Sequence, residues 1–568
     1  MNMANQSRLY MPTQLLILFS IGVMVQAQTL FGSRMVEAAD AKVHFRWVEQ
    51  FAQSLAEGVL YPRWAALSYE GLGDPSFLYI HPLFYYASAA LRILTGDTVT
   101  AMLWACTLAN IFGTLFTLFM LRAQFRQQDW LPTLICALLL LSPYGFHLAS
   151  YQQFLPMQFA MAFMTIYLTA LMLPPGRPRR LTLILAVGLA TASHILIAFM
   201  MLLCSLPALL RNAYREPTGQ RLRQLLTDGL CIGVGLGLAG IYLIPALSLQ
   251  SLITPTGWYF EKYLDWHNSF LFQTSLTMPA YGFRWFHLQW TVPILTFLLL
   301  CFLACGLLFL HRSGNNNRRT ILAMDLLLVA VLALLLGTEP SYPLWNNSTI
   351  LQRLQFPLRF LSVASVATTL GFGILIAEIH VCGHRRLAMS AIVLSLTGSL
   401  AMLLALEGQF YREARPAIEF MRPATHYPGQ PEMRPAGVSQ NWYEWIRNGG
   451  FQAECGRHGA TCTTVINRTH ERQWNITLPE PANLRLPLFA FPGWKFNAGL
   501  PQAINMDKDS GLAMVTLPAG NHVIQAHWQT MTAEWRGLGV SLVFLLATAV
   551  LVFPVRRRQS ITAQQTGA

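Results

Sequence analysis

The sequence carries little charge for its length. Of its 568 residues, 11% are Asp, Glu, Lys or Arg and 54% are hydrophobic. Soluble domains carry roughly a quarter charged residues, so this composition excludes an ordinary soluble protein and predicts a polytopic protein of the lipid bilayer. The net charge of +13 does not indicate nucleic-acid binding, because the basic residues cluster at the ends of apolar runs, as an orientation signal requires.

Several functional signatures are also missing. No glycine-rich loop of the Walker type is present, which argues against direct use of ATP. No internal repeat of the kind found in secondary transporters is visible. The nine cysteines show no zinc spacing. Seven of them lie in or beside apolar runs and are expected to be small buried hydrophobes, namely Cys106, Cys136, Cys204, Cys231, Cys301, Cys305 and Cys382. Cys455 and Cys462 could form a disulfide in an oxidising compartment.

Apolar runs long enough to cross a bilayer, about 17–25 residues each, recur along most of the chain. We predict about twelve spans, near 13–30, 98–121, 131–149, 155–174, 180–193, 194–211, 228–249, 291–310, 320–337, 358–379, 386–406 and 536–555. The loops on one side are all basic, which predicts that both termini lie in the cytoplasm. The first run is short, and Val25-Gln-Ala27 resembles a signal-peptidase site. We favour an uncleaved anchor, with cleavage as the alternative.

The runs divide the chain into three parts. Residues 1–407 form a transmembrane core that includes an extracytoplasmic loop at 31–97. Residues 408–533 form an extracytoplasmic β-rich domain, for which alternating stretches separated by Pro and Gly from Gln473 onward predict a small β-sandwich. Residues 534–568 form the final helix and a cytoplasmic tail. The predicted fold class is therefore mostly α, a polytopic membrane protein with a β-rich domain before its last helix.

The loop at 31–97 concentrates polar and aromatic side chains that the rest of the chain lacks. Its candidate site residues are Glu37, Asp40, His44, Arg63, Trp64, Tyr79, His81 and Tyr85. Asp40 and His44 share one face if their segment is helical. The alternative interpretation is a solvated pair on an interfacial helix. The aromatic stretch from Phe77 to Leu94 is predicted to form helices lying at the membrane interface.

A second group of polar residues meets the membrane near the start of a later span. Arg353, Gln355 and Arg359 either snorkel to lipid headgroups or hold a lipid phosphate, whose oxygens match the planar donors of arginine. Asp325 lies within a predicted span and should face the bundle interior, where its charge can be compensated. His194 lies between two weakly apolar runs and is expected to be a structural histidine with its hydrogen bonds satisfied.

The order of these elements resembles the bacterial membrane proteins grouped as 6-pyruvoyl-tetrahydropterin synthase-related, which look like GT-C-type glycosyltransferases. The resemblance runs through nearly the whole chain. Its motifs include Asp40-x-x-x-His44, Tyr61-Pro62-Arg63-Trp64, Leu354-Gln-Phe-Pro-x-Arg359-Phe and Phe491-Pro-Gly-Trp494-Lys. GT-C enzymes often carry two adjacent acids in the first outside loop. Here Glu37 and Asp40 are not adjacent, which leaves their division of roles open.

The resemblance implies transfer of a sugar from a polyprenyl-phosphate carrier to an envelope glycan, lipid or protein at the outer face of a bacterial inner membrane. On this hypothesis Asp40 is the general base, and His44 orients it or contacts the phosphate. Arg63, Arg353 and Arg359 hold the phosphate, with Trp64 and Gln355 beside them, while Tyr79, His81 and Tyr85 line the lipid or sugar path. Glu37 and Asp40 could together hold a divalent cation. The rival functions are a flippase for lipid-linked glycans and a non-catalytic scaffold for envelope assembly.

Overall fold

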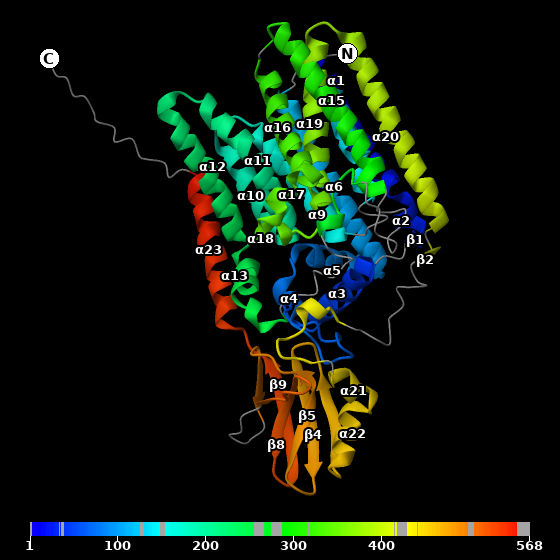
Figure 1. The fold of residues 1–568 in the computed structure, drawn as a ribbon, viewed down its shortest axis with the longest axis vertical. Helices are drawn as coiled ribbons and strands as arrows, with labels where there is room; N and C mark the ends of the chain where they lie inside the picture. The colour runs from blue at the N-terminus through cyan, green and yellow to red at the C-terminus, as the bar shows by residue number, and fades with distance from the viewer. Residues whose placement is uncertain are drawn as a thin grey trace, which may run out of the picture.

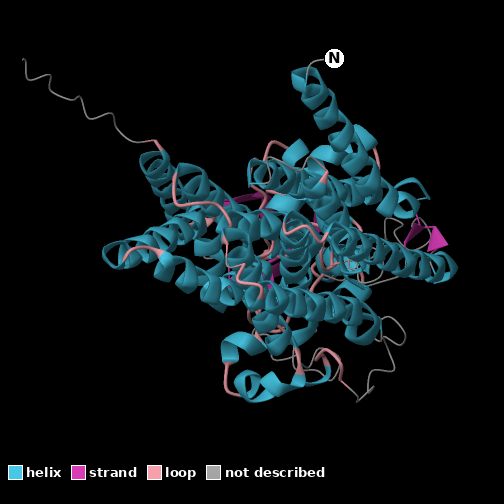
Figure 2. Ribbon diagram, turned by 90° about the horizontal axis from the view of Figure 1, so that it is seen from above, coloured by secondary structure: helices cyan, strands magenta, loops and turns pink. Residues whose placement is uncertain are grey.

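The computed structural model describes residues 3–32, 34–35, 39–124, 130–147, 154–254, 266–273, 287–315, 317–413, 415–416, 429–439, 441–497 and 505–553. A bundle of long helices stands above a small β-domain, with short helices between the two (Figure 1). Seen from above, the helices gather around the long axis and the strands lie beneath them (Figure 2). We call the lower end of the bundle in Figure 1 its β-domain end.

The bundle is built from apolar helices that pack around α19. Each residue of α19 from Leu361 to Ile379 is buried, as expected for a helix that is apolar all round. The bundle helices are α1 (Met3–Val25), α2 (Ala27–Gly32), α6 (Thr98–Gln124), α7 (Leu131–Leu140), α8 (Pro143–His147), α9 (Leu155–Leu171), α10 (Arg177–Ser193), α11 (Ile195–Arg215), α12 (Thr218–Leu238), α13 (Gly240–Ser248), α15 (Val292–Arg312), α16 (Arg318–Gly337), α17 (Tyr342–Asn346), α18 (Thr349–Gln352), α19 (Leu361–Val381), α20 (Arg385–Glu413) and α23 (Thr532–Val552).

Within the described ranges, seven helices are long and apolar enough to cross a membrane. An eighth span results if α12 and α13, which meet at a bend of 73°, form one broken span. Each of the predicted apolar runs contains at least one helix. Some of these helices are shorter than the predicted run. One of them, α7, ends at Leu140, just before Pro143, which has no N–H to continue the helical hydrogen bonds. The predicted mostly α, polytopic fold class is confirmed.

Charges inside the bundle are compensated. Asp325 of α16 is 4% exposed and forms ion pairs with Arg211 at 2.9 Å and Arg215 at 2.5 Å, both from α11. Arg179 and Asp228 pair at 2.6 Å between α10 and α12. The prediction that Asp325 faces the bundle interior is confirmed.

The first loop forms three helices between the bundle and the β-domain (Figure 1). They are α3 (Ala39–Ala56), α4 (Ser76–Tyr79) and α5 (Leu83–Thr95). The stretch from Phe77 to Leu94 thus forms helices, and α5 with its 13 residues is too short to cross a bilayer. A two-residue pairing of β1 (Arg34–Met35) with β2 (Arg415–Pro416) joins the start of the loop to the end of α20.

The β-domain consists of two antiparallel sheets that share one apolar core. One sheet has the order β3-β4-β9-β6 and the other β5-β8-β7. On β4, Trp474, Ile476 and Leu478 alternate inward, the period of two expected for a half-buried strand. The strands are β3 (Thr461–Asn467), β4 (Glu471–Leu478), β5 (Ala482–Phe489), β6 (Trp494–Asn497), β7 (Asn505–Met506), β8 (Leu512–Leu517) and β9 (Gly520–Trp528), preceded by helices α21 (Asn441–Arg447) and α22 (Gly450–Arg457). The predicted β-rich domain before the last helix is confirmed.

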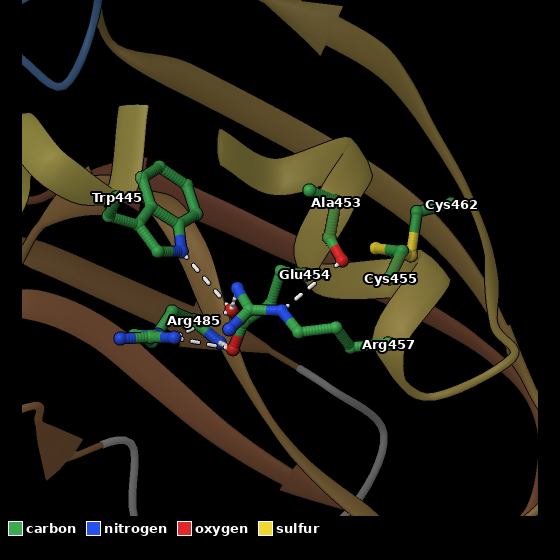
Figure 3. The surroundings of a disulfide bond; sticks show 7 residues. All are labelled: Trp445, Ala453, Glu454, Cys455, Arg457, Cys462 and Arg485. Carbon is green, nitrogen blue, oxygen red and sulfur yellow. Dashed lines mark hydrogen bonds and ion pairs between the residues drawn. A yellow bond between two sulfur atoms is a disulfide. The ribbon is translucent and has the colours of Figure 1, made fainter. Parts of the chain in front are cut away.

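The cysteine predictions have mixed outcomes. Cys455 and Cys462 form a disulfide, with Cα atoms 6.2 Å apart. Beside it, Glu454 accepts hydrogen bonds from Trp445 and Arg485 (Figure 3). Of the seven remaining cysteines, four are buried as predicted. For Cys301, Cys305 and Cys382 the prediction was wrong, since all three are exposed. Cys301 and Cys305 lie on the outward face of α15, and Cys382 lies just after α19 ends.

Candidate functional site

Helix α3 presents Asp40 and His44 on the same side. Asp40 lies in its first turn and His44 follows four residues later, the spacing that aligns two side chains on one face. A carboxylate in the first turn is also favoured by the helix dipole. Phe45, Val48 and Phe51 of the same helix are buried and anchor it. Asp40 and His44 are each half-buried.

Tyr85 of α5 joins this pair. Its hydroxyl lies 2.8 Å from Nδ1 of His44, and its ring packs at angles against Trp47, Phe51 and Phe84. Burial, and then the negative charge of Asp40, raise the pKa of Tyr85 well above its usual range. Because the surrounding rings fix Tyr85, its hydroxyl sets the orientation of the His44 imidazole.

His81 connects this group to the bundle helices. Its ring centroid lies 4.6 Å from that of His194, and its Nδ1 lies 3.3 Å from the hydroxyl of Tyr242 on α13. His194 caps α11 by accepting from the N–H of Ile197, which agrees with the structural role expected for it. Its place against His81 was not expected, because nothing in the local sequence around His194 points to the first loop.

Arg359 brings a buried positive charge to this group. It lies in the turn Pro357–Phe360, immediately before α19, and is 8% exposed. Its guanidinium donates to the carbonyl of Leu354 at 2.7 Å and lies over the ring of Phe356. The preceding Gln355 has φ 66°, a left-handed conformation that residues other than glycine rarely adopt. Such strain is found most often at functional sites.

Electrostatics link Arg359 to the first loop. Burial raises the pKa of Asp40 to about 6, and the positive charge of Arg359 limits the rise. Burial, followed by the charge of Arg359, lowers the pKa of His81 to about 4. Burial, followed by His81, lowers the pKa of His44 to about 3. At pH 7 the group therefore combines a carboxylate that is mostly ionised with neutral imidazoles, each offering one donor and one acceptor nitrogen.

Two other predicted residues lie at the junction with the β-domain. Arg63 forms an ion pair with the buried Glu534 at the start of α23, and its guanidinium lies 3.2 Å from the centre of the Tyr61 ring. Trp64 is 2% exposed and packs in an aromatic cluster with Phe491, Trp494 and Trp528. Both residues hold the loop against the domain.

The remaining predicted residues are more scattered. Tyr79 donates its hydroxyl to the carbonyl of Leu249 at 2.7 Å. Arg353 is exposed at the end of α18, and Gln355 is half-buried in the turn before Arg359. Glu37 lies outside the described residues. The structure thus brings together Asp40, His44, His81, Tyr85 and Arg359, which we call the loop–bundle cluster.

Glu432 is a carboxylate that the sequence analysis missed. It lies in the turn Pro431–Met433, which is held by the hydroxyl of Tyr69 donating to the carbonyl of Gln430 at 2.8 Å. Burial raises the pKa of Glu432 to about 7, and the charge of Asp40 adds to the rise. No motif marks Glu432, because its place near Asp40 arises only when the chain returns from the bundle.

Within the described ranges, no three His, Cys, Asp or Glu side chains are grouped so that they could hold a metal ion. A pair formed by Asp40 with Glu37 lies outside what those ranges can test.

Several solved structures resemble the fold at low sequence identity. The apo oligosaccharyltransferase of Archaeoglobus fulgidus matches with 13% identity and a TM-score of 0.42, over 78% of this chain and 58% of its own. ArnT from Cupriavidus metallidurans matches in its apo state with 14% identity and a TM-score of 0.31, over 65% of this chain and 77% of its own. The same ArnT bound to undecaprenyl phosphate matches with 14% identity and a TM-score of 0.29, over 67% and 79%. The chain thus spans little more than half the length of the archaeal enzyme.

No protein of curated function matches the sequence. Residues 77–407 match the sequence model of a family described as the 6-pyruvoyl-tetrahydropterin synthase related domain, a membrane protein. The matched region begins in α4 and ends in α20, so it contains His81, Tyr85, His194 and Arg359. The chain belongs to the family of 6-pyruvoyl-tetrahydropterin synthase-related membrane proteins.

Proposed function

We propose that the protein is a membrane glycosyltransferase that moves a sugar from a polyprenyl-phosphate carrier to an envelope acceptor, with Asp40 as the general base. The observation that carries this proposal is the convergence of Asp40 and Arg359 at the β-domain end of the bundle. A half-buried carboxylate and a buried guanidinium from distant parts of the chain influence one another there. Sugar transfer from a lipid phosphate needs one group of each kind.

The reaction follows from these two charges. The acceptor hydroxyl attacks the anomeric carbon and its proton passes to the carboxylate of Asp40. The bond between that carbon and the phosphate oxygen breaks, and its electron pair leaves with the carrier phosphate. A positioned base contributes typically about 10²–10⁴-fold to the rate. Arg359 stabilises the charge that gathers on the phosphate, and a fixed, buried cation is well suited to that role.

The neutral members of the cluster complete the site. The hydrogen bond between Tyr85 and His44 fixes the His44 ring, from where the imidazole can orient the carboxylate of Asp40 or the acceptor. His81, with His194 and Tyr242 behind it, offers uncharged donors and acceptors that suit sugar hydroxyls.

The location of the cluster suits a lipid-borne donor. The short helices α3 and α5 lie where the bundle ends (Figure 1), so a carrier in the bilayer can present its phosphate there. The basic loops at the opposite end favour a cytoplasmic location for that end. We therefore propose a bacterial inner membrane protein with both termini inside and the site outside, acting on an envelope glycan, lipid or protein.

A profile of lipid-linked sugars tests the proposal. Membranes are compared from cells with the wild-type protein, without it, or with Asp40→Asn, and each variant is quantified by immunoblot. The matched control is Asp509→Asn, which makes the same change at an exposed site on the β-domain. We expect the null and Asp40→Asn strains to accumulate one polyprenyl-phosphate sugar that the wild type and the control consume.

Two outcomes would contradict different parts of the proposal. If the null strain accumulates such a lipid but Asp40→Asn does not, the protein acts on the lipid and Asp40 is not the base. If the null strain accumulates none, the transferase assignment fails and the scaffold function takes its place.

A further inference from the structure

Two adjoining cavities lie among the bundle helices. The larger, about 60 Å³, is lined by residues of α1, α6, α7, α8, α9 and α19. The smaller, about 20 Å³, lies between α8, α15, α19 and α20. Ser142, Ser365 and Thr369 line both. The hydroxyls of Ser142 and Ser365 are 3.2 Å apart, so one hydrogen-bonded pair forms part of the wall that the cavities share.

The lining of the larger cavity is polar but uncharged. Besides the shared residues, its hydrogen-bonding side chains are Gln26, Thr107, Asn110, Thr114, Gln158 and Thr165. None of the described residues that line either cavity is charged. An ion would therefore be buried without compensation, which is strongly unfavourable. A hydrocarbon tail would leave the Oε1 of Gln158 without a hydrogen bond. This lining fits small neutral molecules that donate and accept hydrogen bonds.

Two buried polar atoms face these cavities without a partner in the described part of the chain. Gln158 lines the larger cavity, is 3% exposed, and its Oε1 has no hydrogen bond. Thr368 lines the smaller cavity, and its hydroxyl is likewise unpartnered and buried. Within a membrane, where no bulk solvent is at hand, such atoms are costly unless something bonds to them.

Other buried hydroxyls of the same bundle show how the protein avoids this cost elsewhere. The hydroxyls of Thr169 on α9 and Thr117 on α6 are 3.2 Å apart. The Thr169 hydroxyl also lies 2.8 Å from the carbonyl oxygen of Thr165, one turn earlier, to which it donates. Tyr167 pairs with Ser205 at 2.8 Å. Side-chain pairs satisfy these groups, whereas Gln158 Oε1 and the Thr368 hydroxyl face a cavity and have no such pair.

We propose that the two cavities form one hydrated site within the membrane bundle, occupied by a cluster of water molecules. Each cavity exceeds the roughly 10–15 Å³ that one water needs, and the larger has room for several. These waters bond to Gln158 and Thr368 and tie α19, the central helix, to α9. The site does not depend on the proposed transferase activity.

Radiolytic hydroxyl-radical footprinting of the full chain in lipid nanodiscs tests this site. Radicals generated from bound water oxidise side chains next to that water. Met161 lines the larger cavity, whereas Met157 and Met164 of the same helix do not and are 1% and 0% exposed. Since Met161 is itself only 6% exposed, the three form a matched set. We expect Met161 to be oxidised about tenfold faster than Met157 and Met164.

A cavity-filling variant separates bound water from other routes of oxidation. Gly145 lines the larger cavity, and an added Cβ there meets nothing within 4 Å. Gly145→Leu should lower the Met161 rate to that of Met164. Gly145→Val serves instead if the larger variant is not monodisperse on gel filtration. Equal rates for the three methionines in the wild type would mean dry cavities and overturn the proposal. So would a fast Met161 that the filling variant leaves unchanged.

Discussion

At the scale of single residues, Asp40 has two opposing requirements. A general base must be ionised to act, yet its strength as a base rises with its pKa. Burial alone would favour the neutral acid, and the buried charge of Arg359 restrains that tendency. A pKa of about 6 leaves most molecules ionised at pH 7 while making the carboxylate a stronger base than an exposed aspartate. On the proposed function, Arg359 therefore tunes the base as well as binding the phosphate.

This balance predicts the dependence of sugar transfer on pH. Only ionised Asp40 accepts the proton, so kcat/KM should fall about tenfold per pH unit below about 6 and level off above pH 7. Protonation of His44 and His81 should not change kcat/KM in this range, because their lowered pKa values keep both rings neutral. The measurement is the initial rate from pH 4.5 to 8. Enzyme held at pH 4.5 and assayed at pH 7 should recover full activity, which excludes unfolding. A fall in kcat/KM centred near pH 4 would contradict the raised pKa of Asp40.

Part of this cluster could be read from the sequence. Asp40 and His44 follow from their spacing on a predicted helix, and Arg359 from its place at the start of a span. That Glu432 and His194 lie next to this cluster could not be found in this way, because their neighbours lie in distant segments and no local pattern records the contact. Arg63 and Trp64 show the converse, since both lie in a conspicuous motif yet fold into the junction with the β-domain.

At the scale of elements, α23 is fixed to the first loop by one buried acid. Glu534 is 2% exposed. It pairs with Arg63 and also accepts from the N–H of Met531 at 2.7 Å, which caps the start of α23. Glycines bring the same helix against α13, where a Cβ at Gly537 would lie 2.7 Å from the carbonyl oxygen of Gly240. The strands could be predicted from alternating apolar residues and from turn residues. The docking of α23 against the first loop and α13 could not, because contacts between distant segments leave no periodic pattern in the sequence.

Neutralising Glu534 should therefore destabilise the protein. Glu534→Gln leaves Arg63 as a buried charge without its partner, a change that typically costs about 3–5 kcal/mol. We expect a Tm lower by several degrees in detergent, measured by fluorescence of a thiol-reactive dye. Glu480→Gln, at an exposed turn between β4 and β5, is the matched control. The pair Arg63→Met with Glu534→Met should recover part of the loss. An unchanged Tm for Glu534→Gln would show that the ion pair contributes little.

At the scale of the whole molecule, the β-domain and the first loop behave as one cap on the bundle. Glu57, which follows α3, accepts hydrogen bonds from the backbone N–H and the hydroxyl of Thr469, at 2.7 and 2.6 Å. Arg472 of β4 donates to the carbonyl of Ala66 at 3.3 Å. These contacts join segments separated by most of the chain, so the loop–bundle cluster and the β-domain must lie on the same side of the membrane.

That coupling turns orientation into a testable property of the whole chain. Val465 on β3 is 53% exposed. The exposed Cys382 lies in the turn between α19 and α20, and α20 begins at the end of the bundle away from the β-domain (Figure 1). If the basic loops are cytoplasmic, a membrane-impermeant maleimide added to cells with a permeable outer membrane should label Val465→Cys. It should reach the native Cys382 only after the inner membrane is opened. Because both thiols belong to one chain, each serves as the control for the other. The reverse pattern would place the cluster in the cytoplasm, where the base could not meet an acceptor of the envelope.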